Sequence, residues 1–385
     1  MKIKSLAAVI LCALINAVQS LCAQNWVSNN VPNYPWQLVA SSADGSVLVA
    51  ATENYGPIYT STNSGVNWSA NNAPNYAWNA VVASADGTKM AAAGFSTYMS
   101  PIAIYSSTNS GASWTQVSTV PYGESCAMAA SADGTKLVLV AWNNPIYLST
   151  NSGTTWTTTG TSDQYTTVAS SADGTKLVAA GWNTSAIYVS TNTGATWIPH
   201  SVPFNSMWSS ACSADGSKMV VVGRGDPIYL SSDSGTTWTE ATNAPQTEWL
   251  SVASSADGNK IVAYDEMDNA VFSSTDAGAN WTSNAAPSYG LTLASSGDGN
   301  KLVAVSPDSI YTSYSTPSPQ LNITPLGTLS WVVPSTNFVV QKNTDLTQTN
   351  WTTLPNIPTL NLTNLQDEIY LSPSNSVGFY RLIAY

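Results

Sequence analysis

Four acidic residues stand in the most variable segments of the sequence and are the first candidates for chemistry. They are Glu53, Glu124, Glu248 and Asp265. A glycoside hydrolase needs two carboxylates about 5 to 9.5 Å apart across the bond that it cleaves. The four acids belong to different repeats of the chain, so the sequence does not say which pair would face across a cleft. Hydrolysis of a polysaccharide is one function that the sequence leaves open.

Aromatic residues fall in the same variable segments and point to binding. Six of the 15 tryptophans lie there, namely Trp36, Trp78, Trp142, Trp182, Trp208 and Trp249, and Tyr165 and Arg224 stand at matching places in other repeats. Exposed rings beside carboxylates and amides suit neutral sugars, which stack their apolar C–H faces on the rings while their hydroxyls find acceptors. We predict that these eight residues form a ligand-binding surface. The alternative for each tryptophan is packing between adjacent repeats as core.

The sequence offers little for metal or cofactor chemistry. His200 is the one histidine, so a His-rich metal site or a Ser-His-Asp triad has little support. We expect no metal and no cofactor.

Residues 1–23 have the layout of a cleaved secretory signal, with two lysines before an apolar run that ends in small residues. Asn16 and Gln19 interrupt the run well short of the roughly 20 residues that a spanning helix needs. The residues before Cys22 also lack the small side chains of a lipoprotein signal. We therefore expect a secreted, periplasmic or cell-surface protein with no membrane insertion.

The charge balance disfavours anionic partners. Loss of Lys2 and Lys4 with the leader leaves 9 of the 11 Lys and Arg residues against 22 Asp and Glu, a net charge of about −13. Nucleic acid and anionic membranes both require clustered cations, so we expect neither as a partner. Cys126 and Cys212 remain after cleavage; we expect two buried thiols, with a disulfide as the alternative in an exported protein.

An internal repeat positions all of these candidates. The phrase S-A-D-G, or a near copy, precedes a short apolar run seven times, at intervals of 40 to 47 residues. Its aspartates are Asp44, Asp86, Asp133, Asp173, Asp215, Asp257 and Asp298. A period near 40 residues that is filled with short strands and turn signals is typical of a propeller blade. The sequence predicts an all-β fold, a seven-bladed β-propeller over residues 24–316 with four strands in each blade.

The two ends of this repeat region complement each other. N-W-V-S-N-N-V-P-N-Y-P-W at 25–36 copies N-W-S-A-N-N-A-P-N-Y-A-W at 67–78, so the N-terminal segment is a fourth strand without its first three. The last repeat lacks that strand. We predict that Trp26 completes the blade that begins near Leu291, which closes the ring and removes both free sheet edges. The chain is then expected to be a monomer.

A second motif, S-T-N-S-G-T-T-W at 149–156, has five close relatives. Its third position is Asn in four copies and Asp in Asp233 and Asp276. A catalytic or metal-binding carboxylate would not lose its charge in four copies of six, so the side chain is predicted to hold a turn by accepting a backbone N–H.

This motif resembles the Asp-box, or BNR, repeat of the sialidase-like propellers, and the resemblance covers about residues 25–315. It implies a β-propeller with the boxes as peripheral turns, and it covers sialidases, xyloglucan-cleaving hydrolases, photosystem assembly factors and binding propellers alike. Sialidases hold a carboxylate with three arginines, whereas this chain has two, Arg224 and Arg381. The assembly factors carry an arginine-rich patch that is absent here. We therefore expect a non-sialidase member.

Residues 317–385 follow a Ser/Pro-rich link and contain alternating apolar runs separated by turn residues, which predicts a C-terminal β-sandwich module. Taken together, the sequence predicts a secreted, non-catalytic propeller that binds a neutral glycan or a protein on its aromatic loop face. The first alternative is an extracellular glycoside hydrolase using a carboxylate pair on that face. The second is a structural scaffold or adhesion protein.

Overall fold

The computed structural model describes residues 25–52, 54–97, 99–123, 126–182, 186–204 and 206–314, and in the tail 322–323, 328–332, 338–343, 350–355, 358–361, 366–370 and 379–384. The predicted leader at 1–23 lies outside the described residues. Within them all regular structure is β, and no helix there is long and apolar enough to cross a membrane.

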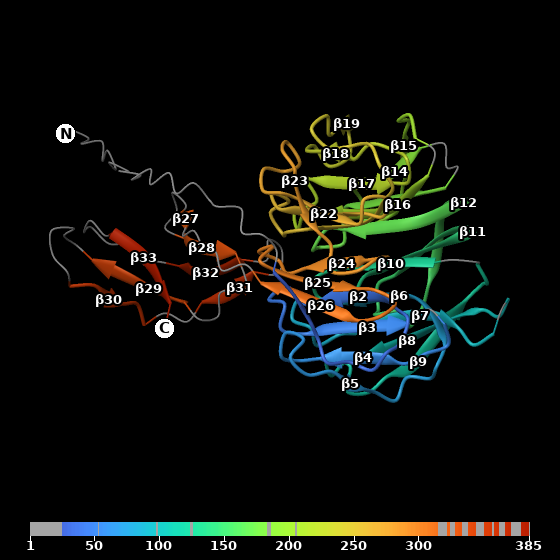
Figure 1. Cartoon of the computed structure of the whole chain (residues 1–385), viewed down its shortest axis with the longest axis horizontal. Coiled ribbons are helices and arrows are strands. Elements are labelled where there is room, and N and C mark those ends of the chain that lie inside the picture. The colour runs from blue at the N-terminus through green and yellow to red at the C-terminus, as the bar shows by residue number, and fades with distance from the viewer. Residues whose placement is uncertain are drawn as a thin grey trace, which may run out of the picture.

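The repeats form antiparallel sheets, most of them four-stranded as propeller blades are. The first two sheets are β2 (Trp36–Ser41), β3 (Leu48–Thr52), β4 (Ile58–Ser61) and β5 (Ser69–Ala70), then β6 (Ala77–Ala83), β7 (Met90–Phe95), β8 (Ile102–Ser107) and β9 (Thr115–Val120). Two later sheets are β16 (Met207–Cys212), β17 (Met219–Gly223), β18 (Tyr229–Ser231) and β19 (Thr239–Glu240), then β20 (Trp249–Ser254), β21 (Ile261–Asp265), β22 (Ala270–Ser274) and β23 (Thr282–Ala285). Figure 1 shows these sheets gathered on one side of the molecule.

The third and fourth repeats are fused into one sheet of six strands. Its strands are β10 (Cys126–Ala130), β11 (Leu137–Ser149), β12 (Thr157–Ser170), β13 (Leu177–Gly181), β14 (Ile187–Ser190) and β15 (Ile198–His200). The prediction of variable loops at Trp142 and Tyr165 is wrong, because both residues lie within the long strands β11 and β12. Two register shifts around Asn144 let β11 continue through what was expected to be a loop.

The N-terminal segment pairs with the last repeat, as the sequence predicts. Strand β1 (Trp26–Ser28) runs antiparallel to β26 (Ile310–Tyr314) and completes a sheet with β24 (Thr292–Ser295) and β25 (Lys301–Val305). Beyond the strand, the Asn29 N–H donates to the Ile310 carbonyl at 2.8 Å. The outer edge of β26 is therefore covered by the other end of the repeat region.

The core lies between neighbouring sheets. The second strand of most repeats is buried at every position, as in β3, β13, β17 and β21. Such strands are nearly continuous apolar runs, LVAAT, LVAAG, MVVVG and IVAYD, because both of their faces are covered. The first and last repeats share one apolar cluster, in which Leu48 and Ala50 pack with Val303 and Val305.

A cycle of seven main-chain hydrogen bonds joins the S-A-D-G turns. Each N–H donates to the carbonyl of the equivalent residue in the next repeat at 2.6 to 2.8 Å, in the order Ala43, Ala85, Ala132, Ala172, Ala214, Ala256, Gly297 and back to Ala43. Lysines of the same turns add a second layer. From Nζ, Lys89, Lys136, Lys176, Lys218 and Lys301 each donate to the carbonyl of the turn aspartate in the following repeat at 2.7 to 3.0 Å.

The turn aspartates are committed to their own turns. In the fourth repeat Asp173 accepts hydrogen bonds from Ser171 and from the N–H and hydroxyl of Thr175. Burial raises the pKa of Asp173, but these hydrogen bonds and nearby Lys136 outweigh it and leave the pKa below its usual value. At Asp298 burial prevails and the pKa is raised.

The Asp boxes hold turns, although by a longer-range bond than an Asx turn. In all six copies Oδ1 of the Asn or Asp accepts the backbone N–H four positions later at 2.9 Å. The motif glycine has a φ of +77° to +88°, which a residue without a Cβ adopts freely. Asn and Asp are interchangeable here because only the one shared acceptor oxygen is needed.

Cys126 and Cys212 are unpaired. Burial raises the pKa of each thiol to about 12, so neither is a reactive thiolate near neutral pH.

The described part of the tail forms two small sheets, which Figure 1 shows apart from the repeats. One contains β27 (Asn322–Ile323), β28 (Thr328–Val332), β31 (Thr359–Asn361) and β32 (Gln366–Tyr370), and the other β29 (Phe338–Asn343), β30 (Thr352–Thr353) and β33 (Phe379–Ala384). Leu329, Trp331 and Ile369 of the first pack with Val340 of the second in one buried cluster. This arrangement is that of two facing sheets.

Deleting residues 25–30 should lower the melting temperature and promote aggregation, because it removes the ladder on β26 and leaves that strand as a free edge. Circular dichroism melts and light scattering measure both effects. Val27→Ala is the control, since the Val27 side chain is 56% exposed. An unchanged melting curve for the deletion would contradict a structural role for β1.

Replacing Asn151 by Ala should cost about 1 kcal/mol of stability, because the Thr155 N–H loses its acceptor. Asn151→Asp should be nearly neutral, as Asp stands at this position in two natural copies. Chemical denaturation of the three proteins side by side provides the measurement. Equal losses for Ala and Asp would show that the turn depends on more than one acceptor oxygen.

Candidate ligand-binding face

Five side chains form a continuous feature that we call the aromatic strip. They are Trp142 in β11, Trp182 directly after β13, Trp208 in β16, Arg224 directly after β17 and Glu266 directly after β21. Four successive repeats contribute to the strip. Four of its residues lie at or directly beside the strand ends opposite the S-A-D-G turns, and Trp142 lies within the long strand β11.

The first half of the strip is a contact between tryptophans of two repeats. The rings of Trp142 and Trp182 lie 5.6 Å apart at an interplanar angle of 66°, and Trp182 is 47% exposed. The Trp182 backbone bridges to Ser206, whose hydroxyl accepts a hydrogen bond from the Trp208 indole at 2.8 Å. The three indoles therefore follow one another across neighbouring repeats.

Charged groups continue the strip beyond Trp208. The guanidinium of Arg224 lies over the Trp208 ring, 5.0 Å from its centroid, and donates to Glu266 at 2.8 Å. Both members of the ion pair are about 40% exposed, so the pair adds little stability. Its effect is to orient the Trp208 face and to neutralise the one arginine of the repeats.

The base of the strip is held by side-chain hydrogen bonds and by strand pairing. The amide of Asn144 donates to the carbonyls of Tyr122 and Trp142, and its oxygen accepts from the Tyr147 hydroxyl at 3.0 Å. The pairing of Trp142 with Gln164 across β11 and β12 fixes the indole on a strand. A ligand that stacks there would not have to order a loop, which lowers the entropic cost of binding.

Four residues that the sequence placed on the binding surface are buried instead. Trp36, Trp78, Trp249 and Tyr165 are at most 1% exposed. Trp36 and Trp249 begin β2 and β20, Trp78 is the second residue of β6, and Tyr165 lies within β12. Each packs against an aromatic ring of the third strand of its repeat. Their ring partners, 5.2 to 5.7 Å away, are Tyr59, Tyr105, Phe272 and Tyr188 respectively. For these four the alternative of core packing is correct, and burial raises the pKa of Tyr165 to about 12.

Of the four carboxylates considered for hydrolysis, the structure describes Glu248 and Asp265. Glu53 and Glu124 lie outside the described residues. Asp265 is fully buried, and its Oδ1 accepts the Thr247 hydroxyl at 2.7 Å and the Met267 N–H at 3.0 Å. Asp265 thus fixes the loop that carries Glu266. Glu248 is half-buried, and its carbonyl accepts the Glu266 N–H at 2.9 Å.

Glu266 is a strip residue that was absent from the predicted ligand-binding set. Its position within the repeat could have identified Glu266 from the sequence. Four strip residues, Trp142, Trp182, Arg224 and Glu266, each stand nine residues after the turn aspartate of their repeat. Further exposed apolar side chains near this face, Met267 and Tyr289, are each 69% exposed.

The chain is a repeat protein built mostly from four-stranded antiparallel sheets. Sheets and turns of this kind are found in Asp-box propellers. No family model matches the chain, and no curated protein matches it. Solved structures do. YCF48 bound to a D1 peptide aligns with a TM-score of 0.59 and 16% identity, over 77% of this chain and 96% of that one. YCF48 from Cyanidioschyzon merolae aligns at 0.57 and 14%, over 75% and 98%.

Two larger enzymes are also similar. The GH74 xyloglucanase from Xanthomonas campestris aligns with a TM-score of 0.61 and 15% identity, over 80% of this chain but 59% of the enzyme. Niastella koreensis GH74 gives 0.60 and 16%, over 79% and 58%. At these identities the likeness establishes the fold alone.

Asp265→Ala should destabilise the protein, because it leaves the buried Thr247 hydroxyl unpaired, at about 1 to 3 kcal/mol, and removes the acceptor of the part-buried Met267 N–H. Asp265→Asn retains one acceptor and should cost less. Thermal melts compare the two variants, with the exposed neighbour Asp268→Ala as the control. Equal melting of Asp265→Ala and the parent would contradict the structural role.

Proposed function

We propose that the chain is an exported, closed seven-bladed β-propeller that binds a neutral glycan along the aromatic strip without cleaving it. Support for the closed ring comes from the cycle of seven turn hydrogen bonds and from the pairing of β1 with β26. Support for export comes from the signal-like residues 1–23 and the low charge content.

The observation that carries the binding proposal is the run of three tryptophans on successive repeats, closed at one end by Arg224 and Glu266. Exposed indole rings such as that of Trp182 offer apolar surfaces on which the C–H faces of sugar rings can stack. The paired charges offer a donor and an acceptor to hydroxyl groups. With Arg224 neutralised by Glu266 and no other arginine in the repeats, an anionic chain would gain little at this surface.

Binding is favoured over hydrolysis by the burial of Asp265. This carboxylate is inaccessible, and its Oδ1 holds its own loop through Thr247 and Met267, which favours a structural role for it. A polypeptide segment is the second candidate ligand, because a similar fold, YCF48, has been solved with a D1 peptide.

Trp182→Ala and Trp142→Ala should each weaken glycan binding about tenfold, since one lost stacking contact is worth roughly 0.5 to 1.5 kcal/mol beyond the buried area. A glycan array identifies the ligand, and titration calorimetry measures the loss. Tyr370→Ala, an equally drastic change at a 65% exposed ring in the tail, should bind as the parent does.

Other results of this experiment would overturn the proposal. Release of reducing ends that is abolished by a Glu→Gln change would identify a hydrolase. Binding of peptides but of no glycan would show that the ligand of the strip is a protein. If the protein binds neither glycans nor peptides, the scaffold role remains.

A further inference from the structure

The row of residues that forms most of the strip continues past Glu266 into the last repeat. The residue nine positions after the turn aspartate is Glu266 in the sixth repeat and Pro307 in the seventh. Pro307 is exposed. By the register of the repeats, Pro307 is therefore the next residue of the row.

A main-chain contact recurs beside the residues of this row. In the fourth, fifth and sixth repeats the N–H of the row residue donates, at 2.9 to 3.1 Å, to the carbonyl of the residue nine positions before the turn aspartate. These pairs are Trp182 with Gln164, Arg224 with Ser206, and Glu266 with Glu248. The matching pair of the last repeat is Pro307 with Tyr289. Proline has no N–H to donate, so other contacts must hold these two segments together.

The residues on both sides of Tyr289 supply those contacts. The Ser288 hydroxyl donates to Oδ1 of Asp308 at 3.0 Å. Gly290 lies so close to the Pro307 ring that a Cβ added to the glycine would be 3.6 Å from the proline Cδ. Tyr289 itself is 69% exposed. The tyrosine is therefore held beside Pro307 by its neighbours while its own side chain faces solvent.

The loop that carries Met267 is joined to the loop that carries Tyr289. The hydroxyl of buried Tyr264 donates to Oδ1 of Asn269 at 3.0 Å and accepts the N–H of Gly290 at 3.0 Å. Met267 directly follows Glu266 and is 69% exposed. The equivalent residues of the other repeats are polar or glycine, namely Asn54, Ser96, Asn143, Asn183, Gly225 and Asp308. An apolar side chain at this position is thus particular to the repeat that ends the strip.

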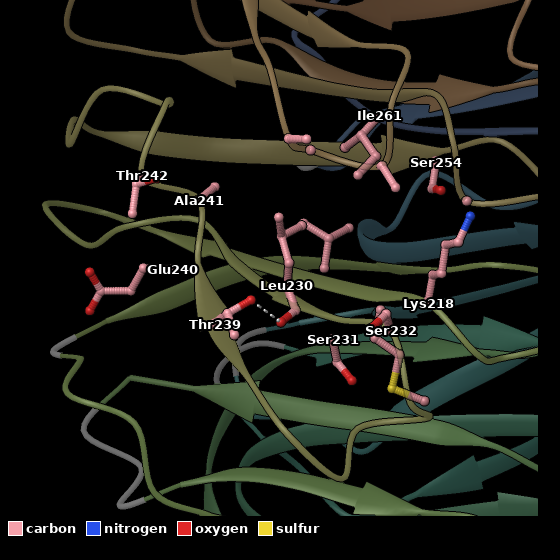
Figure 2. A pocket seen from close by; sticks show the side chains of 16 residues that line it. Lys218, Leu230, Ser231, Ser232, Thr239, Glu240, Ala241, Thr242, Ser254 and Ile261 are labelled. Atoms are coloured by element: carbon pink, nitrogen blue, oxygen red, sulfur yellow. Dashed lines mark hydrogen bonds between the residues drawn. The ribbon is translucent and has the colours of Figure 1, made fainter.

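The cavity in Figure 2 does not extend the strip. It has a volume of about 290 Å³ and lies at the strand ends that carry the S-A-D-G turns, where Leu230 and Ile261 point toward one another across it. A chain-like ligand that continues past Glu266 therefore meets exposed side chains and not this cavity.

We propose that Met267, Tyr289 and Pro307 form a second subsite, the far subsite, for further sugar units of the same neutral polysaccharide chain that binds the strip. This inference rests on the proposed function. The occupant follows from continuity, since the far subsite begins at the residue after Glu266. The apolar surfaces of the tyrosine and proline rings suit the C–H faces of sugar units. The ligand is then a polysaccharide bound along its length, not a single terminal sugar.

The charges around the far subsite fit a neutral ligand. Asp268 and Asp308 are exposed beside it, and Arg224, the one arginine of the repeats, is already paired with Glu266. Hydrogen bonds from Ser306 and Ser288 outweigh burial and hold the pKa of Asp308 below its usual value, so this carboxylate is ionised at neutral pH. It can accept hydroxyl groups of a neutral sugar, whereas it repels uronate and sulfate groups.

The test uses the full chain with ¹³C-labelled methionine methyl groups and three neutral polysaccharides as probes, galactomannan, laminarin and mixed-linkage β-glucan. A polysaccharide that binds should shift the methyl signal of Met267. Met99 is the internal control, because it is 65% exposed in the loop after β7 of the second repeat, which contributes nothing to the strip. Its signal should not move.

Variants then separate the far subsite from the strip. Tyr289→Ala should weaken binding of the polysaccharide roughly tenfold, and Tyr289→Phe, which keeps the ring, should bind as the parent does. Binding of the matching disaccharide, mannobiose, laminaribiose or cellobiose, should be weakened by Trp182→Ala but not by Tyr289→Ala, since the disaccharide is too short to reach both subsites. Titration calorimetry measures these affinities.

The outcomes distinguish this inference from the proposed function. If Trp182→Ala weakens polysaccharide binding while Tyr289→Ala does not, the strip stands and the far subsite is overturned. Equal shifts of Met267 and Met99 would also overturn the far subsite. If none of the polysaccharides binds, the proposed function and this inference both fail.

Discussion

Seven main-chain hydrogen bonds, each from one S-A-D-G turn to the next, set the spacing of every repeat from its neighbours. Small residues are required there, since six of the seven positions are alanine and one is glycine. At most of the turns, the lysine that follows donates a further hydrogen bond from Nζ to the carbonyl of the turn aspartate in the next repeat. Because these bonds repeat in register, residues at equal distances from the turn aspartate take equivalent places around the molecule.

The aromatic strip is a consequence of this register. Side chains nine residues after the turn aspartate emerge at the far end of the second strand, and four successive repeats place Trp, Trp, Arg and Glu there. Trp208, from a neighbouring first strand, completes the row through its hydrogen bond to Ser206. Contact between adjacent repeats therefore turns five separate sequence positions into one surface.

The same regularity explains how differently similar tryptophans behave. Trp36, Trp78 and Trp249 lie at or near the start of first strands, where the third strand of the same sheet offers an aromatic partner. Trp182 follows a second strand and extends beyond the sheet.

The sequence by itself determined the all-β class, the period, the turn role of the Asp boxes and the pairing of Trp26 with the last repeat, because each depends on local patterns that recur in register. Only the tertiary structure decided which aromatic rings are buried, that β11 and β12 extend through the expected loops, and that Asp265 fixes a loop. Those outcomes depend on which side chains of neighbouring strands and repeats meet. Such contacts join residues that are far apart in the sequence, so local sequence patterns do not reveal them. The strip itself lies between these cases, since its register is written in the sequence but its contacts arise only when the repeats pack.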